Sequence, residues 1–195
     1  LRIKMVTRIL FSYPDYSLTA LDDQDKDLIL RWRNSESIRH YMYDTRMITP
    51  EEHDKWFRKE LNNEKSRHFI FREKGRPVGF VSFTDINDRD RRCSWAFNLS
   101  DERESLQKGL GAVMEYFAIE HVFEKMSIEK LCCEVLDFNT AVVRLHQRFG
   151  FNKEGFLQKH IHRNDGVFGV VVMALFREDW IVMRGDIAKT LFSAS

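Results

Sequence analysis

The sequence predicts an α/β fold with one mixed central sheet flanked by helices, and three observations lead to this prediction. Helical patterns fill much of the first third of the chain. Apolar runs separated by turn-forming residues then indicate an antiparallel meander. Two strand–helix units follow, before a last apolar run at residues 167–176. Helices, then a meander, then two βα units are typical of an α/β domain.

The first third contains a short strand and two helices with recognisable beginnings. The strand lies at residues 16–21, and the Asp pair at 22–23 can cap a helix that runs to about residue 33. A second helix begins at Thr49-Pro50-Glu51-Glu52. Thr49 is a good N-cap, proline suits the first helical position, and Glu52 completes a capping box.

The remaining strands are recognised from apolar runs of strand length. Three of them, at residues 68–72, 78–83 and 94–99, are separated by turn-forming or polar segments and form the meander. The runs at residues 131–136 and 167–176 provide two more strands. The last run is continuously apolar, which predicts a central strand buried on both faces.

Length, charge and cysteine usage exclude several classes of protein. A chain of 195 residues is most simply a single domain, and a net charge of +1 argues against a nucleic-acid-binding protein. The longest apolar run has ten residues, far below the ~20 that span a bilayer, so no membrane contact is expected. Three cysteines, two of them adjacent, make no disulfide framework and indicate a reducing cytoplasm.

The segment Gln107-Lys108-Gly109-Leu110-Gly111-Ala112 has the features of an anion-binding turn. It follows the strand at residues 94–99 and opens a long helical pattern. The first N–H groups of a helix have no internal partner, and the helix dipole adds partial positive charge there. Glycines let a phosphate approach the main chain. A helix that merely starts near two glycines is the alternative interpretation.

A second segment follows the strand at residues 131–136. Asn139 is a good N-cap for the helix that comes next, and Val142, Leu145 and Phe149 recur at helical spacing. Gly150 suits the position just after the helix.

Together these two segments resemble the acyl-CoA-binding core of the GNAT N-acetyltransferases. In that family the first loop reads Arg/Gln-x-x-Gly-x-Gly/Ala, and the later segment reads Asn-x-x-Ala-x-x-Leu-Tyr-x-x-x-Gly-Phe. The chain shares Gly109, Gly111, Asn139, Leu145 and the pair Gly150-Phe151. It departs at Leu106, where Arg or Gln is usual, and at His146, where the family has a tyrosine that acts as general acid.

The resemblance implies the GNAT fold over about residues 16–180 of a single domain covering residues 1–195, with the sheet splayed between the fourth and fifth strands. It implies acetyl-CoA as co-substrate, and no metal is expected. His160 and His162 share a strand face but lack a third ligand at a clear spacing. The residues expected to bind acetyl-CoA are Phe97, Leu99, Gln107, Lys108, Gly109, Leu110, Gly111, Ala112 and Asn139.

The first third resembles one branch of the same superfamily. The motifs Trp32-Arg33-Asn34, Met42-Tyr43 and Glu52-His53-x-x-Trp56 are similar to those of enzymes that acetylate a UDP-linked amino-sugar in pseudaminic acid biosynthesis. The acceptor there is the 4-amino group of UDP-4-amino-4,6-dideoxy-N-acetyl-β-L-altrosamine. Ribosomal-protein Nα-acetyltransferases share Trp-Arg-Asn-like openings.

The residues of this branch suit a nucleotide-sugar. A diphosphate needs a cation, which Arg33 or Arg39 can supply, and uracil needs a flat or soft surface, which Met42 and Tyr43 can supply. His53 can hydrogen-bond the sugar or a phosphate. Each also has an ordinary interpretation, as a core residue for Met42 and Tyr43 and as a surface residue for the others. Their clustering favours the substrate role.

Two residues are candidates for proton transfer. Glu134 lies in an otherwise apolar strand, so a carboxylate there, if partly buried at the cleft, would be a base for the acceptor ammonium. Its alternative role is an ion pair with an arginine. His146 takes the place of the usual tyrosine acid and either protonates the CoA thiolate or packs in the core. A backbone N–H near residues 97–99 would stabilise the oxyanion.

Two other functions stay open beside the acetylation of a UDP-linked amino-sugar. One is acetylation of a protein N-terminus, and the other is a non-catalytic domain that binds CoA. The expected partners are acetyl-CoA and the UDP-linked amino-sugar, with a homodimer as one open state of assembly. Neither nucleic acid nor a membrane is expected as a partner.

Overall fold

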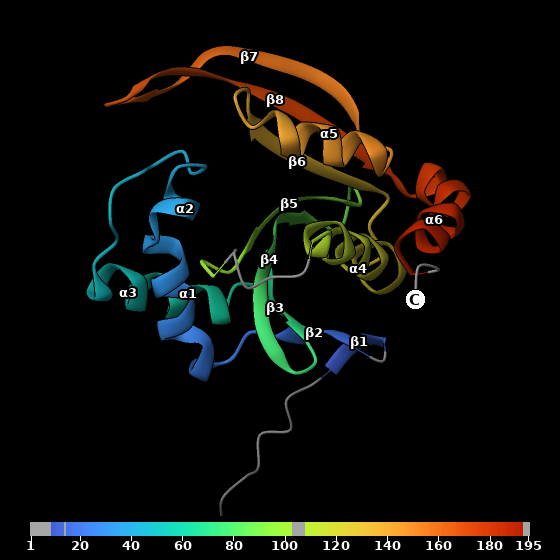
Figure 1. Cartoon of the computed structure of the whole chain (residues 1–195), viewed down its shortest axis with the longest axis horizontal. Helices are drawn as coiled ribbons and strands as arrows, with labels where there is room; N and C mark the ends of the chain where they lie inside the picture. Colours follow the sequence, from blue (N-terminus) through green and yellow to red (C-terminus); the bar gives the residue numbers. More distant parts are fainter. Residues whose placement is uncertain (1–8, 14, 103–107, 193–195) are drawn as a thin grey trace, which may run out of the picture.

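The computed structural model of the chain describes residues 9–13, 15–102 and 108–192 (Figure 1). The strands are β1 (Ile9–Tyr13), β2 (Tyr16–Ala20), β3 (Arg67–Glu73), β4 (Arg76–Asn87), β5 (Arg92–Leu99), β6 (Lys130–Leu136), β7 (Asn152–Arg163) and β8 (Gly166–Phe176). The helices are α1 (Lys26–Asn34), α2 (Glu36–Arg39), α3 (Pro50–Leu61), α4 (Leu110–Lys125), α5 (Thr140–Arg148) and α6 (Arg177–Phe192), with a short 3-10 helix at Asp23–Asp25.

The strands form one mixed sheet in the order β1-β2-β3-β4-β5-β6-β8-β7. The β5–β6 pair is parallel, and the other neighbours are antiparallel. The parallel pairing runs only from Arg92↔Lys130 to Ser94↔Cys132. Beyond it, β5 continues along β4 while β6 continues along β8, so the two strands separate. These are the fourth and fifth of the predicted strands, and the predicted splay between them is confirmed.

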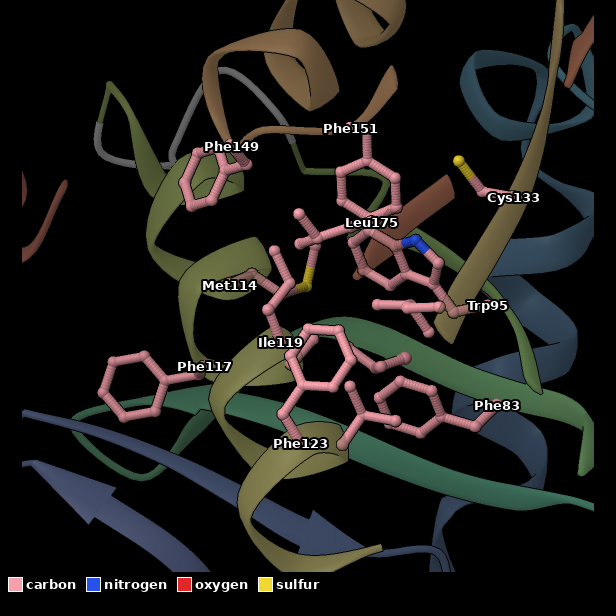
Figure 2. Packing of buried hydrophobic residues seen from close by; sticks show 14 of the residues in the cluster. Phe83, Trp95, Met114, Phe117, Ile119, Phe123, Cys133, Phe149, Phe151 and Leu175 are labelled. Atoms are coloured by element: carbon pink, nitrogen blue, oxygen red, sulfur yellow. The ribbon is translucent and has the colours of Figure 1, made fainter. Parts of the chain in front are cut away.

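Helices cover both faces of the sheet. Figure 1 shows α1, α2 and α3 grouped on one side of strands β3–β5 and α4 on the other. The larger core lies between α4 and the sheet, where side chains of α4 such as Met114 and Ile119 pack against Phe83 and Trp95 (Figure 2). A smaller core around Trp32 joins α1 and α3 to the opposite face. Helices α1 and α3 therefore pack on a hydrophobic core that is separate from the one under α4.

The helix ends follow the local sequence. Thr49 and Glu52 form the predicted capping box, with Pro50 as the first helical residue. Asp22 caps the short 3-10 helix that leads into α1. Gly150 lies just after α5 with φ of +91°, the left-handed conformation that glycine adopts without steric cost.

Four elements were not predicted, namely β1, α2, β7 and α6. The exposed strand β7 lacks the alternation of buried and exposed residues that marks a half-buried strand. Helix α6 buries only Trp180 fully, so its amphipathic signal is weak. Because β7 pairs outside β8, the apolar strand at residues 166–176 lies one position from the sheet edge rather than at its centre.

Candidate active site

The splay between β5 and β6 opens a cavity of about 330 Å³. Its walls include residues 95–99 of β5 and residues 133–136 of β6, where the two strands no longer pair. The main chain of β5 therefore has one edge that no strand covers. Phe97 and Leu99, both expected to bind acetyl-CoA, lie on this edge and line the cavity.

The predicted anion-binding turn closes one end of this cavity. Gly109 occupies the N-cap position of α4 with φ of +87°, and Gly111 lines the cavity. The N–H groups of Ala112 and Val113 return to the carbonyl of Gly109. Among the described residues, none accepts a hydrogen bond from the N–H of Leu110 or Gly111. This is the arrangement that binds a phosphate at a helix N-terminus.

The other residues expected to bind acetyl-CoA contribute in different ways. The Leu110 side chain is buried, so only its backbone can reach a ligand. Lys108 is exposed, and Gln107 lies outside the described residues. Asn139 occupies the N-cap position of α5 as predicted, but its side chain makes no capping hydrogen bond. That side chain instead lines the cavity.

Helix α5 brings His146 to the same cavity. The helix ends in a Schellman motif, in which the N–H of Phe151 donates to the carbonyl of His146 and the N–H of Gly150 to that of Gln147. A Cβ on Gly150 would lie 2.4 Å from the sulfur of Met183, so a larger residue would also require the Met183 side chain to move. The Gly-Phe pair seen in the sequence thus fixes the end of α5 that carries His146.

A second cavity, of about 470 Å³, lies on the side of α1 and α3. It shares four lining residues with the first cavity, namely Met42, Ala96, Phe97 and Asn98. The two cavities therefore meet at the middle of β5. A ligand in one and a ligand in the other would approach each other at this junction.

The structure brings the four predicted acceptor residues to these cavities. Arg33 and His53 line the second cavity, Tyr43 lines the first, and Met42 lines both. The loop that carries Met42 and Tyr43 is held by Arg163 of β7, whose Nη1 donates to the carbonyls of His40 and Met42 at 2.9 and 3.1 Å. The β7–β8 hairpin therefore supports the loop that carries Met42 and Tyr43.

Arg33 is the better placed of the two candidate cations. Its Nη2 donates to the carbonyl of Asp44 at 2.6 Å, whereas its Nη1 is buried with no hydrogen-bond partner among the described residues. Burial lowers the pKa of Arg33, although the carboxylate of Asp44 opposes this shift. Arg39, in contrast, donates to the backbone carbonyls of Asn34 and Thr45 and so holds the loop.

His53 is buried against the ring of Trp56. Its Nε2 lies 2.8 Å from the carbonyl of Lys26, and a carbonyl only accepts, so Nε2 carries the proton. Burial lowers the pKa of His53. The neutral ring therefore has Nδ1 as its acceptor nitrogen at neutral pH.

Glu134 and Tyr43 form a contact between the two halves of the molecule. The Tyr43 hydroxyl donates to Oε2 of Glu134 at 2.6 Å. Burial and the nearby carboxylate both raise the pKa of Tyr43, so its hydroxyl stays protonated at neutral pH. Glu134 lines the first cavity, as its proposed role as a base requires, and its side chain is exposed.

His146 has a partner that the sequence did not predict. Its Nδ1 lies 2.7 Å from Oε1 of Glu115 on α4, and both side chains are almost fully buried. The rings of Trp95, Phe97 and Phe151 surround the imidazole. Burial raises the pKa of Glu115, against the opposing effect of His146. A carboxylate within the apolar residues of α4 was the available signal.

The orientation of His146 leaves one nitrogen for a ligand. With Nδ1 on Glu115, Nε2 has no hydrogen-bond partner among the described residues, and the residue lines the first cavity. A histidine that only packed would not need a buried carboxylate. The geometry therefore favours a polar role for His146 over packing alone.

Comparison with known proteins identifies the family. Residues 17–152 match the family model of the acetyltransferase (GNAT) domain. The chain belongs to this family. It is thus an acetyl-CoA-dependent N-acetyltransferase.

Individual relatives are distant. The chain is 26% identical to the acetyltransferase PseH of Campylobacter jejuni over 135 residues, which cover 69% of this chain and 82% of the relative. It is 22% identical over 130 residues to the uncharacterized prophage-derived N-acetyltransferase YokL of Bacillus subtilis, covering 67% of this chain and 72% of the relative. Among solved structures, the spermidine N-acetyltransferase of Vibrio cholerae in complex with CoA and spermine has a TM-score of 0.80 at 20% identity, covering 87% of this chain and 99% of that one. This last likeness supports the fold alone.

Two other kinds of feature are absent from the described part of the chain. Within residues 9–13, 15–102 and 108–192, no group of three or more His, Cys, Asp or Glu side chains is arranged to hold a metal ion. Over the same ranges, no helix has the length and apolar character needed to cross a membrane.

Proposed function

We propose that the enzyme transfers acetyl from acetyl-CoA to the 4-amino group of UDP-4-amino-4,6-dideoxy-N-acetyl-β-L-altrosamine, in pseudaminic acid biosynthesis. The observation that carries the reaction geometry is the junction of two cavities at residues 96–98 of β5. Acetyl-CoA in the first cavity would present its thioester there, to an amine that enters from the second.

The first cavity has the groups that CoA requires. The N-terminus of α4 binds the pyrophosphate through the main-chain N–H groups of Leu110 and Gly111, and the uncovered edge of β5 binds the pantetheine arm. The side chain of Asn139 lies at the same cavity and makes no capping hydrogen bond. The chain's own backbone, rather than charged side chains, would hold the anion.

The second cavity suits a nucleotide-sugar. Trp56 and Phe80 provide flat apolar surfaces for a base. Nη1 of Arg33 is buried without a partner among the described residues and can donate to a phosphate oxygen. A buried donor without a partner costs free energy, so a ligand oxygen at this position would be stabilising. The similarity to PseH supports the same acceptor class.

The chemistry needs a base, an oxyanion donor and an acid. Glu134 is placed to accept a proton from the acceptor nitrogen, directly or through a water, and Tyr43 orients its carboxylate. A backbone N–H of residues 97–99 stabilises the oxyanion. His146 donates a proton from Nε2 to the departing CoA thiolate, and Glu115, hydrogen-bonded to Nδ1, holds the ring in place.

The acceptor assignment is tested by acetyl-CoA consumption across a panel of amines. The panel contains the UDP-linked 4-amino-sugar, peptides with free N-termini, and spermidine. We expect the UDP-linked sugar to have the highest kcat/KM, and Arg33→Ala to raise its KM at least ~10-fold. Arg31→Ala is the matched control, since Arg31 is exposed on the same helix and outside both cavities.

Other outcomes of the panel would change the assignment. A preference for peptides would favour N-terminal acetylation, and no turnover with any amine would favour a domain that only binds CoA. Equal effects of Arg33→Ala on the sugar and on acetyl-CoA would make Arg33 a structural residue.

The CoA site has its own test in Gly111→Glu. A Cβ added at Gly111 would have Leu99 as its nearest neighbour, at 3.8 Å, so a side chain fits without a clash in the free protein. It would place bulk and negative charge where the pyrophosphate binds. We expect calorimetry to show at least ~100-fold weaker acetyl-CoA binding. Gly185→Glu, on exposed α6 with open space around it, is the control, and unchanged binding in Gly111→Glu would remove the site.

A further inference from the structure

A row of polar side chains crosses the sheet from the junction of the two cavities. Ala96 of β5 is the cross-strand partner of Ser82 on β4, and Ser82 is the partner of His68 on β3. The Ser82 hydroxyl lies 3.0 Å from Nδ1 of His68. Nε2 of His68 lies 3.2 Å from Oε2 of Glu60 on α3. Ser82, His68 and Glu60, here called the Ser82 row, form one continuous hydrogen-bonded chain.

The Ser82 row connects two cavities that share no lining residue. Ser82 lines the second cavity, here called the acceptor cavity, beside the small side chain of Ala96. His68 and Glu60 line a separate cavity of about 900 Å³ at the end of α3. Exposed residues such as Leu61, Glu64 and Lys125 also line that cavity, so it opens to solvent. One end of the row therefore faces the acceptor and the other faces water.

The hydrogen-bond directions suit outward movement of a proton. Glu60 Oε2 also accepts from Ser66 and Asn63, and a carboxylate only accepts, so Nε2 of His68 is the donor. Nδ1 of the neutral ring then accepts from the Ser82 hydroxyl. The serine oxygen keeps its lone pairs for a proton from the acceptor cavity.

The surroundings of His68 keep the ring neutral and ready to accept. Burial lowers the pKa of His68, and Glu60 opposes this shift. Burial alone would raise the pKa of Glu60, but hydrogen bonds from Ser66, His68 and Asn63 together lower it. The other neighbours of His68 are the uncharged rings of Trp56 on α3 and Phe80 on β4. The end of α4 contributes Lys125 and His121 to the far wall of the same cavity.

Acetyl transfer to an ammonium releases protons that need such a route. The nitrogen forms the N–C bond and loses two protons, while the C–S bond breaks and sulfur gains one. One proton per turnover must therefore reach the solvent. Resting on the proposed function, we propose that the Ser82 row carries away the proton that the acceptor ammonium loses before attack. Ser82 passes its proton to Nδ1 of His68 as it takes one from the ammonium, and His68 releases its Nε2 proton toward Glu60 and water. Glu134 then takes the second proton as the amide forms.

The pH dependence of turnover in Ser82→Ala tests this role. The substrate is the amine with the highest kcat/KM in the panel above, so the test does not depend on the acceptor being the UDP-linked sugar. We expect kcat to fall at least ~10-fold near about pH 6.5, where the amine arrives protonated. The loss should nearly vanish near about pH 10, where the amine arrives neutral. Acetyl-CoA affinity should not change.

Two further variants keep the test decisive. His68→Phe preserves the stacking on Phe80 and should reproduce the same pH-dependent loss. Ser94→Ala removes a hydroxyl from β5 outside the row and outside both cavities, and it should follow the wild type at every pH. A loss of equal size at every pH in Ser82→Ala, or no loss in both row variants, would overturn the proposal.

The same order of serine, histidine and carboxylate activates nucleophiles in other enzymes. Mass spectrometry of the enzyme mixed with acetyl-CoA alone separates the two roles. We expect no acetyl group on Ser82, because direct transfer needs none. An acetylated Ser82 that disappears when the amine is added would make the serine a nucleophile and would also overturn the relay. If the wild type acetylates no amine in the panel, the proposed function fails first and independently.

Discussion

Two carboxylates at or next to the first cavity lie in opposite environments. Glu134 is exposed on the splayed end of β6 and accepts a hydrogen bond from Tyr43. Glu115 is fully buried on α4 and is paired with His146. A carboxylate at the cleft surface can exchange protons with water and substrate. A buried, paired carboxylate instead fixes the orientation of its partner.

The structure distinguishes Glu134 from Glu115 in a way that the sequence does not. Glu134 is conspicuous in the sequence because it interrupts an apolar strand, yet its side chain is exposed. Glu115 is one of several acidic residues in a long helix, yet it is the one that meets His146. The surroundings of a carboxylate in the folded protein decide whether it can act as a base or as a positioning residue. How strongly it stands out from its neighbours in the sequence does not.

The largest effect is expected when Glu134 is changed. Glu134→Gln keeps the size and the hydrogen bond from Tyr43 but removes the basic oxygen. If it is the base, turnover should fall by ~10²–10⁴ at neutral pH with acetyl-CoA binding nearly intact. Steady-state kinetics and calorimetry on the same sample measure both quantities. A fully active variant would assign both protons to other groups, with the Ser82 row as the first candidate.

A smaller effect is expected from Glu115→Gln. Glutamine can still hydrogen-bond Nδ1 of His146, but it removes the carboxylate. We expect turnover to fall ~10-fold or more, because the amide cannot exchange a proton with the imidazole that transfers one. Glu120→Gln is the matched control, because Glu120 is also buried on α4 but accepts from Trp180 and lies outside the cavities. Equal losses in the two variants would make Glu115 a structural residue.

The same pair complicates the simplest test of His146. His146→Phe leaves the carboxylate of Glu115 buried without a partner, which costs on the order of 3–5 kcal/mol in stability. The double variant His146→Phe with Glu115→Leu removes both polar side chains and should recover most of that stability in urea unfolding. Turnover should stay low in the double variant if His146 is the acid. Full activity there would reduce His146 to a packing residue.

The smallest expected effect comes from His121, a buried histidine on α4 whose Nδ1 has no hydrogen-bond partner among the described residues. Nδ1 of His121 makes no hydrogen bond to any of them, and burial lowers the pKa of His121 to about 4. The unfolded chain, with a pKa of roughly 6.5, binds more protons, so stability is complete above that pH and is lost as the pH falls toward 4. His121→Phe should reduce this acid loss by roughly 2–3 kcal/mol.

Urea unfolding near neutral pH and near about pH 4.5 measures the difference for His121. His160→Ala is the control, since His160 is exposed on β7. Part of the acid loss should persist in His121→Phe, because burial also lowers the pKa of His53 and of His68. An unchanged acid profile would mean that His121 takes up a proton in the folded state without cost.

Much of the fold was predictable because its signals are local. The capping box at Thr49, the glycine turn at Gly109 and the apolar strands at residues 131–136 and 167–176 each depend on neighbours in sequence. Elements with weak local signals were missed. Strand β7 is mostly exposed, so its sequence lacks the alternation of apolar and polar residues that marks a half-buried strand. Its backbone is held by pairing with β8, which the sequence does not show.

The candidate site was predictable in its parts and not in its connections. The sequence located Glu134, Tyr43 and His146 but not the hydrogen bond between Tyr43 and Glu134, which are 91 positions apart. It also gave no indication that Glu115 meets His146 or that Ser82 meets His68 and Glu60. Such contacts depend on which strands pair and which helix covers which face.

The sequence by itself determined the family, the glycine turn at the start of α4 and the beginnings of the helices, because helix caps, glycine turns and strand patterns act over a few neighbouring residues. Only the tertiary structure decided which carboxylate is exposed and which is buried, where the two cavities meet, and which histidine has a partner. Burial and hydrogen-bond geometry depend on segments far apart in the chain. They set the surroundings and the hydrogen-bond partners of each titratable group.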